Sequence, residues 1–550
     1  MISSHSLQVA QALVSSALLG LTVVCLPLAL ARAARVFADP AARRDRLVVP
    51  LLLAAIALGA LLRLGLVPHR LATVFIGFQR AHEAIDLVPF AHYGAGASAL
   101  YHVAFQFLPA GHRTMMAVNA VCACLTLPLI AAFAARLFRD RLTGALTALL
   151  VALVPVFVRN DTSDANILPC LLWAFAGLVL WLEHLDDRRP LPLAAATVLL
   201  ALAATGRPEL PALLPLLLLA SAALHPAGLR PLLSRPVLLA GAAFLALIAP
   251  HVLHVAHAIG WLAATDALPG ADAQHLANPS RLLFDHNLLA HPSLFPLALT
   301  LLGLAAVALP PTRRPALVLL ALIVATLFAY AVDLDDSNLA RVLVPAALLM
   351  TMLAAATLSW LRSRPRGLLW LSIALTLTAL SAVPSAARLF APTNEAQEER
   401  LIDALPALLP GDTPYTLVVR GPGDTDEANP DSRFTHLYFP AYAFEPPRGP
   451  GEVWTIDAWR ESPRWDRPAF FYLGFRCYAE FRSQGGPPPR GDNLRPSCRA
   501  MQQEFRLVPV SELELPNHGD PWMPYYGDAP TLRVGLYRVT PPAGGSAPEP

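Results

Sequence analysis

Side chains that could do chemistry gather in one polar stretch between long apolar segments. Residues 78–101 read FQRAHEAIDLVPFAHYGAGASALY and contain Glu83 and Asp86. If residues 79–87 are helical, the two carboxylates lie on one face of that helix. Such a pair can hold a divalent cation, or one member can act as a general base. A solvated surface turn is the alternative, so the position of this stretch relative to the membrane matters.

Two arginines follow later apolar segments. Arg159 stands in VPVFVRNDTSDAN and Arg207 in ATGRPEL. A guanidinium can hold phosphate oxygens through two parallel hydrogen bonds, but an arginine at the end of a membrane span can also be a simple interfacial anchor. Three histidines near the end of another apolar segment are candidates either for a zinc site or for ordinary interfacial positions: His251, His254 and His257.

The composition indicates a polytopic membrane protein. Of the 550 residues, 55% are hydrophobic and only 15% are charged, whereas soluble proteins average about 25% charged. A membrane span needs about 20 apolar residues. Two of the candidate segments are short and could form a re-entrant pair instead. The sequence has no run of basic residues, so it gives no sign of a nucleic-acid partner. The twelve candidates are 7–31, 47–66, 114–136, 142–158, 167–184, 191–205, 210–225, 236–258, 292–310, 315–332, 342–361 and 367–387, of which 191–205 and 210–225 are short.

Arginine residues mark alternate connections between these segments. By the positive-inside rule, the connections that carry them are cytoplasmic. The N-terminus, the loop 67–113, the ends that carry Arg159 and Arg207, and everything after residue 388 are then external. The candidate chemistry is therefore predicted to lie on the outer side. The arginine-bearing connections are 32–46, 136–141, 188–189, 230–235, 313–314 and 362–366.

The composition changes after residue 388. A helix over 393–409 followed by spaced strands predicts a small external α/β domain at 389–540. Residues 541–550 read as a disordered tail. Cys477 and Cys498 both fall in this domain, where an oxidising compartment would favour a disulfide between them. The predicted strands are 416–419, 452–456, 469–475, 505–510 and 532–539.

The order of these motifs resembles the GT-C glycosyltransferases, in particular the bacterial protein O-mannosyltransferase-like and lipid A aminoarabinose-transferase-like branch. The resemblance covers about residues 47–390. The shared motifs follow one another along the chain. The acidic motif of the first external loop comes first and is followed by AHYGAGASALYHVAFQFLP. The span that holds Asn119, the run VPVFVRNDTSDAN and the TGRPE turn come after it. The family usually has an Asp-Glu pair where this chain has His82 and Glu83. Glu83 alone matches directly, and Asp86 is the candidate second carboxylate.

The resemblance implies a GT-C-like membrane domain of about twelve transmembrane helices at 1–388, with 67–113 as its first external loop, and a periplasmic domain at 389–540. It implies an enzyme, a hexosyl- or pentosyltransferase of the bacterial inner membrane. That enzyme would move a sugar from a polyprenyl-phosphate donor to a glycan, lipid or protein acceptor on the periplasmic side. The implied catalytic residues are Glu83 and Asp86, with or without Mg²⁺ or Mn²⁺ bound to them, and the implied substrate-binding residues are Arg159, Arg207, His82 and Tyr93.

Two other classes of protein remain open. A transporter or lipid flippase would also have many spans, but transporters usually show internal repeats and charges in mid-span. No clear repeat is visible, and the charges noted above follow the outer ends of spans. A non-catalytic scaffold with a partner-binding outer domain would leave the Glu83 loop without a role. Consumption of polyprenyl-phosphate sugars would separate both classes from the enzyme.

Overall fold

The computed structural model divides the chain into two compact units. We call residues 1–70, 83–262 and 271–390 the helical unit, and residues 71–82, 263–270 and 391–550 the sheet unit. The structure describes residues 4–38, 45–71, 80–81, 83–87, 94–207, 209–264, 289, 294–331, 343–390, 394–420, 451–478, 480–481, 494–517, 525–526 and 529–541.

The helical unit is built from helices that coincide with the apolar segments of the sequence. Each of the twelve predicted segments contains a helix. The helices are α1 (Ser4–Ala38), α2 (Val48–Leu61), the π-helical turn η2 (Leu62–Leu66), α4 (Ala95–Phe105), α5 (His112–Phe138), α6 (Arg141–Leu153), α7 (Pro155–Asp161), α8 (Ile167–Asp187), α9 (Pro190–Ala204), α10 (Leu210–Leu224), η3 (Arg230–Leu233), α11 (Arg235–Ala264), α13 (Leu297–Ala305), α14 (Arg313–Ala331), α16 (Val344–Arg362) and α17 (Gly367–Arg388).

The lengths of these helices make the chain a multi-span membrane protein. Within the described residues, 7 helices are long and apolar enough to cross a membrane, or 8 if the bent pair α6–α7 is one span. Helices α9 and α10, with 15 residues each, are shorter than the roughly 20 residues of a full crossing. The mainly helical membrane architecture is therefore confirmed, and the total of twelve spans stays a prediction.

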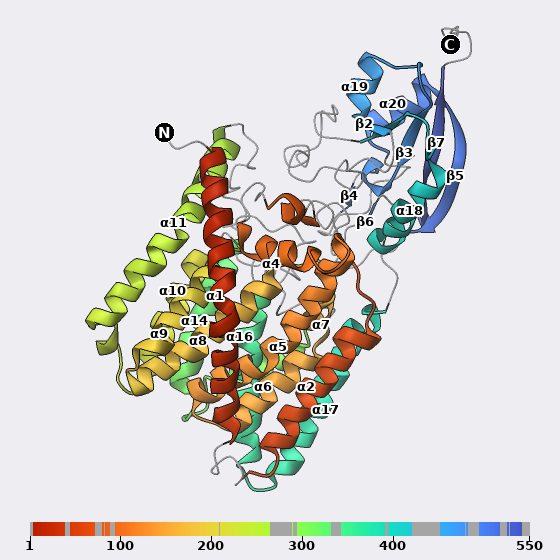
Figure 1. Ribbon diagram of the computed structural model, residues 1–550. Helices are drawn as coiled ribbons and strands as arrows, with labels where there is room; N and C mark the ends of the chain where they lie inside the picture. Colours follow the sequence, from red (N-terminus) through yellow and green to blue (C-terminus); the bar gives the residue numbers. More distant parts are fainter. Residues whose placement is uncertain are drawn as a thin grey trace. The chain divides into compact units, whose positions relative to one another are not determined.

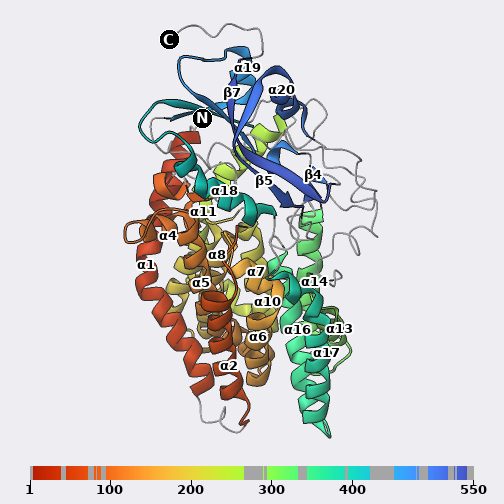
Figure 2. The same ribbon diagram turned by 90° about the vertical axis from the view of Figure 1, so that its right-hand side faces the viewer.

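Close approaches at small residues hold the helical unit together. Helix α8 packs against α5 and α9, and α6 packs against α2, α5 and α16 (Figure 1). A Cβ added at Gly177 of α8 would lie 2.6 Å from Leu200 of α9, and one at Gly144 of α6 would lie 2.4 Å from the Ala131 carbonyl oxygen of α5. Such approaches are typical of membrane helices, whose association depends on packing. Helices α13, α14, α16 and α17 form a neighbouring group (Figure 2).

The sheet unit holds a five-stranded mixed sheet in the order β2–β1–β3–β7–β5. β1 pairs in parallel with β2 and β3, and β7 pairs antiparallel with β3 and β5. The predicted C-terminal domain with a helix and strands is therefore present. Its elements are α18 (Asn394–Leu408), β1 (Tyr415–Val419), β2 (Gly451–Thr455), α19 (Ile456–Glu461), β3 (Ala469–Leu473), η9 (Phe475–Cys477), β4 (Glu480–Phe481), α20 (Pro496–Glu504), β5 (Arg506–Pro516), β6 (Tyr525–Tyr526) and β7 (Thr531–Thr540).

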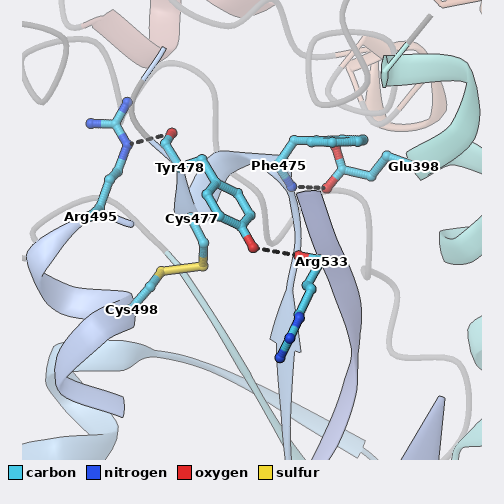
Figure 3. Close-up of a disulfide and its surroundings, with 7 residues drawn as sticks. All are labelled: Glu398, Phe475, Cys477, Tyr478, Arg495, Cys498 and Arg533. Atoms are coloured by element: carbon cyan, nitrogen blue, oxygen red, sulfur yellow. Dashed lines mark hydrogen bonds between the residues drawn. A yellow bond between two sulfur atoms is a disulfide. The ribbon is translucent and has the colours of Figure 1, made fainter. Parts of the chain in front are cut away.

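A buried disulfide joins η9, the short helix after β3, to α20. It joins Cys477 and Cys498, as the sequence predicts (Figure 3). Beside it, Arg495 Nε donates to the Tyr478 carbonyl oxygen at 3.2 Å, and the Tyr478 hydroxyl donates to the Arg533 carbonyl oxygen at 2.6 Å. These contacts connect α20, η9 and β7, so the disulfide belongs to the core of the sheet unit.

Candidate functional site

A break in one apolar segment creates the first part of the candidate site. Residues 142–158 were predicted as one span, but α6 ends at Leu153 and α7 starts at Pro155, with a bend of 65° between them. Val154 has extended backbone angles, φ −68° and ψ 124°, as expected of a residue that precedes proline. The bend brings the polar run Arg159–Asp164 into a buried turn, since all six residues are buried.

An asparagine on α5 holds the turn that follows α7. Asn119 Nδ2 donates to the carbonyl oxygens of Ser163 at 2.8 Å and Ala165 at 3.2 Å. Its Oδ1 accepts a hydrogen bond from the Tyr101 hydroxyl of α4 at 2.7 Å. The Asn119 amide therefore joins three elements, α4, α5 and the connection between α7 and α8. Figure 1 shows α4 lying across the long helices.

Arg207 is tied to the same connection. Its Nη1 donates to Asn166 Oδ1 at 3.1 Å, and its Nε forms an ion pair with Glu209. The carbonyl oxygen of Arg207 lies 3.3 Å from His251 Nε2. The guanidinium is therefore held in a fixed orientation next to the Arg159–Asn166 region, and the side chain is buried.

Helix α4 begins against the turn that carries Arg207. Gly96 N–H donates to the Thr205 carbonyl oxygen at 3.1 Å. A Cβ on Gly94 would lie 1.9 Å from that oxygen and 2.6 Å from His251 Nδ1, and one on Gly206 would lie 2.3 Å from Cys170 Sγ. Because only glycine fits such approaches, the GAG sequence and the TGR turn are matched in shape.

Arg159 lies on α7 and is anchored on the backbone after η2. Its Nη1 donates to the Arg70 carbonyl oxygen at 3.1 Å, and the Arg70 N–H donates to the Thr162 carbonyl oxygen at 3.1 Å. The structure thus joins the two sequence-predicted arginine motifs in one buried polar cluster, in which Arg159 and Arg207 stand at either end of the 160–166 segment.

The two predicted carboxylates differ in burial. Residues 83–86 are helical, with Glu83 buried and Asp86 exposed. The Ala84 carbonyl oxygen lies 2.9 Å from His102 Nδ1, so this helical segment is attached to α4. His82 and Tyr93 lie outside the described residues.

The described residues contain no group of three or more His, Cys, Asp or Glu side chains that could hold a metal ion. His251 and His254 are both buried, but His251 is engaged with the Arg207 backbone. The side chain of His257 lies outside the part of the chain that the structure describes. His251 therefore connects α11 to the Arg207 turn.

Arg63 is a buried residue that the sequence analysis missed. It lies inside the apolar segment 47–66, and its side chain is fully buried. Nε donates to Asp161 Oδ2 at 2.6 Å. A lone arginine in an otherwise apolar span is costly, and such a residue generally has a specific partner and a role. This signal was readable from the sequence, whereas the partner Asp161 was not.

Known proteins resemble the chain at the level of a family model and of fold. Residues 97–254 match the model of the dolichyl-phosphate-mannose-protein mannosyltransferase family. This segment begins in α4 and ends in α11, so it contains Asn119, Arg159 and Arg207. No protein with a curated description matches the chain.

Solved structures add three comparisons. ArnT from Cupriavidus metallidurans in the apo state has 12% identity over 90% of this chain and 98% of that chain, with a TM-score of 0.50. ArnT bound to undecaprenyl phosphate has 13% identity over 90% and 97%, with a TM-score of 0.46. The Archaeoglobus fulgidus oligosaccharyltransferase in complex with Zn and sulfate has 14% identity and a TM-score of 0.41. The match covers 67% of this chain, which spans 60% of the length of that archaeal protein.

The chain is therefore a polytopic membrane protein whose fold is similar to that of ArnT. The match to the mannosyltransferase family model covers residues 97–254, which is less than half of the chain.

Proposed function

We propose that this protein is a membrane-embedded glycosyltransferase that moves a sugar from a polyprenyl-phosphate donor to an acceptor on the periplasmic side of the membrane. The observation that carries the proposal is the buried segment 160–166, which directly follows Arg159 and is hydrogen-bonded by Asn119 and by Arg207. The match of residues 97–254 to a family of lipid-phosphate-dependent mannosyltransferases supports the same chemistry.

The arginines are suited to the leaving group of this reaction. When the glycosidic bond to the carrier breaks, negative charge develops on the phosphate, and fixed guanidinium groups stabilise that charge. Asn166 and Glu209 hold the Arg207 guanidinium in place, which lowers the cost of organising it for phosphate. Arg159 and Arg207 are the proposed phosphate ligands, and His82 and Tyr93 are further candidate substrate contacts.

Glu83 is the proposed general base. Its burial distinguishes it from the exposed Asp86, and a carboxylate shielded from water is the better candidate for removing a proton from the acceptor hydroxyl. The proton would pass to the Glu83 carboxylate as the acceptor oxygen bonds to the sugar and the carrier phosphate departs. A divalent cation, Mg²⁺ or Mn²⁺, held by Glu83 and Asp86 is the alternative role of the pair.

The proposed arrangement keeps the domains predicted from the sequence. Residues 1–388 would form the catalytic membrane domain of about twelve spans, with the N-terminus outside. Residues 389–540 would form a periplasmic domain that helps to select the acceptor, and residues 541–550 a tail. Nucleotide sugars are cytosolic, so an outward-facing site in a bacterial inner membrane needs a sugar delivered on a lipid. Hexosyl and pentosyl donors, and glycan, lipid and protein acceptors, all fit this scheme.

A transporter or flippase is the second candidate, because Arg63 is a buried charge within an apolar span and pairs with the buried Asp161. Their contacts favour a structural role, since Arg63 also donates to the carbonyl oxygens of Val151 and Ala152. A mobile charge pair on a transport path would not be expected to cap helix carbonyls. A scaffold without catalytic activity would consume no donor at all.

The test is a transfer assay in membranes supplied with a labelled polyprenyl-phosphate sugar, comparing Glu83→Gln with Asp86→Asn. The buried carboxylate is expected to matter most: loss of a catalytic base costs roughly 10²–10⁴-fold in rate, whereas Asp86→Asn should cost far less. Undiminished transfer by Glu83→Gln would remove Glu83 from the mechanism. Absence of donor consumption by the wild type would reject the transferase.

A further inference from the structure

We infer that Arg63 is a positioning residue that locks the bend between α6 and α7 and thereby sets the place of Arg159. The inference has a structural part, the lock itself, and a functional part that rests on the proposed role of Arg159 in donor binding.

The bend leaves two backbone carbonyls in need of donors. Pro155 has no N–H, so it cannot donate to the Val151 carbonyl oxygen. The next residue, Val156, is the second of α7, and the first N–H groups of a helix have no partner within it; the axes of α6 and α7 also differ by 65°. A carbonyl oxygen inside a membrane has no water to bond to, so it needs a donor from the protein. The broken span can therefore persist only if another group supplies donors.

Arg63 supplies these donors from the neighbouring span. Its Nη2 donates to the Val151 carbonyl oxygen at 2.9 Å, and its Nη1 donates to the Ala152 carbonyl oxygen at 2.9 Å. Nη1 also contacts the Gly59 carbonyl oxygen of its own helix at 3.3 Å. The guanidinium thus caps the end of α6 in place of the backbone hydrogen bonds that Pro155 removes.

The same guanidinium holds the far end of α7. Asp161 is the last residue of that helix, and its carboxylate accepts from Arg63 Nε at 2.6 Å. One rigid group therefore bridges the last turn of α6 and the last turn of α7, and so fixes the angle between them. Only the five-donor fork of arginine can make these contacts together, because lysine is a point charge with three donors.

Arg63 itself is presented by an irregular turn. It lies in the π-helical turn η2 at the end of α2. Single π-turns of this kind are rare in proteins, and those that do occur are often found at functional sites. The turn places the Arg63 guanidinium against the break between α6 and α7. There it contacts the Val151 and Ala152 carbonyl oxygens and the Asp161 carboxylate.

The position of Arg159 depends on this lock. Arg159 lies on α7 between the break at Val154 and the anchor at Asp161. Without Arg63, Asp161 would be buried without its partner, and the carbonyls of Val151 and Ala152 would need other donors. The bend would relax, and the Arg159 guanidinium would move from its place beside the Arg70 backbone.

The experiment uses two test variants. One is the single change Arg63→Lys, and the other carries both Arg63→Met and Asp161→Leu. Each is compared with a matched control variant. The control is the ion pair of the half-buried Arg32 of α1 with the buried Glu183 of α8, with an N–O distance of 3.1 Å. It is changed to Arg32→Lys and to Arg32→Met with Glu183→Leu. Arg63→Lys keeps the charge and loses the fork. The double variant removes both charges, so no carboxylate is left buried alone, but it leaves the carbonyls uncapped.

Two readouts separate the parts of the inference. The first is the rate at which a thiol reagent modifies Cys170, which packs against Gly206 and donates to the Asn166 carbonyl oxygen at 3.4 Å. Relaxation of α7 is expected to raise this rate in both Arg63 variants and in neither control. The second is the affinity of the purified protein for undecaprenyl phosphate, expected to fall about tenfold or more in the Arg63 variants, because loss of a hydrogen bond to a charged group weakens binding by about that factor.

The outcomes distinguish the lock from the proposed function. Unchanged Cys170 modification and unchanged affinity in Arg63→Lys, in protein that melts like the wild type, would overturn the inference. Equal effects in the Arg32 controls would also overturn it, because any ion pair between helices would then suffice. Faster Cys170 modification with a wild type that binds no undecaprenyl phosphate would support the lock and reject the donor that we propose.

Discussion

Asn119 shows how a single side chain organises the candidate site. Its amide uses both ends, accepting from Tyr101 and donating to two backbone carbonyls of the segment after α7. A fully buried amide in a membrane span is stable only when these groups are paired. Asn119 therefore connects α4 to the 160–166 segment, which lies between Arg159 and the side chain of Arg207.

We predict that Asn119→Leu destabilises the protein. The change leaves the carbonyl oxygens of Ser163 and Ala165 without their donor, at about 1–3 kcal/mol for each group that is left unpaired. Thr126→Val on the same helix is the control, because the Thr126 hydroxyl bonds only to the Cys122 carbonyl oxygen one turn away. Thermal melting in detergent measures both. Equal melting temperatures for the two variants would contradict the role given to Asn119.

At the scale of elements, apolar length predicts a helix better than it predicts where the helix breaks. The segment 142–158 has the length of a span, but Pro155 divides it into α6 and α7 with a 65° bend. Other segments contain a proline within one continuous helix, such as Pro128 in α5. The difference lies in a neighbour: at this break Arg63 supplies the donors that the helix loses, and no local sequence pattern shows that contact.

The disulfide is expected to stabilise the sheet unit through its unfolded state. Cys477 and Cys498 are 21 residues apart, and closing a loop of this length contributes about 3 kcal/mol in the chain-entropy model. We predict that Cys477→Ser with Cys498→Ser lowers the free energy of unfolding of this unit by about that amount. Chemical denaturation of the full protein, monitored in the sheet unit by hydrogen exchange, measures it.

A reducing agent gives the control for this prediction. It should shift the wild type toward the double variant and leave the double variant unchanged. A wild type that resists denaturation equally well with and without reductant, after the thiols have been shown to be free, would contradict the assigned role of the disulfide.

At the scale of the whole molecule, the sequence indicated the membrane class, the positions of the helical segments and the sheet domain, because these follow from apolar length and strand-like runs. It also placed Asn119, Arg159 and Arg207 in motifs that the structure brings together. The partners of Arg63 could not be predicted, because they depend on the packing of α2 against α6 and on the bend before α7. The burial of Glu83 relative to Asp86 depends likewise on the folded surroundings, since both residues look alike in the sequence.

The most direct test of the central claim is cross-linking of Glu83 to the arginine positions from outside the cell membrane. The variants carry cysteine at 83 with 159, or at 83 with 207, in a chain without the free cysteines Cys25, Cys122, Cys124 and Cys170. A short, membrane-impermeant bis-thiol reagent is added to intact spheroplasts, and a pair at 32 and 183 is the inward-facing control. We predict cross-links for both Glu83 pairs before permeabilisation and for the control pair only after it. Failure of both Glu83 pairs to cross-link, or reaction only after permeabilisation, would contradict a shared external site.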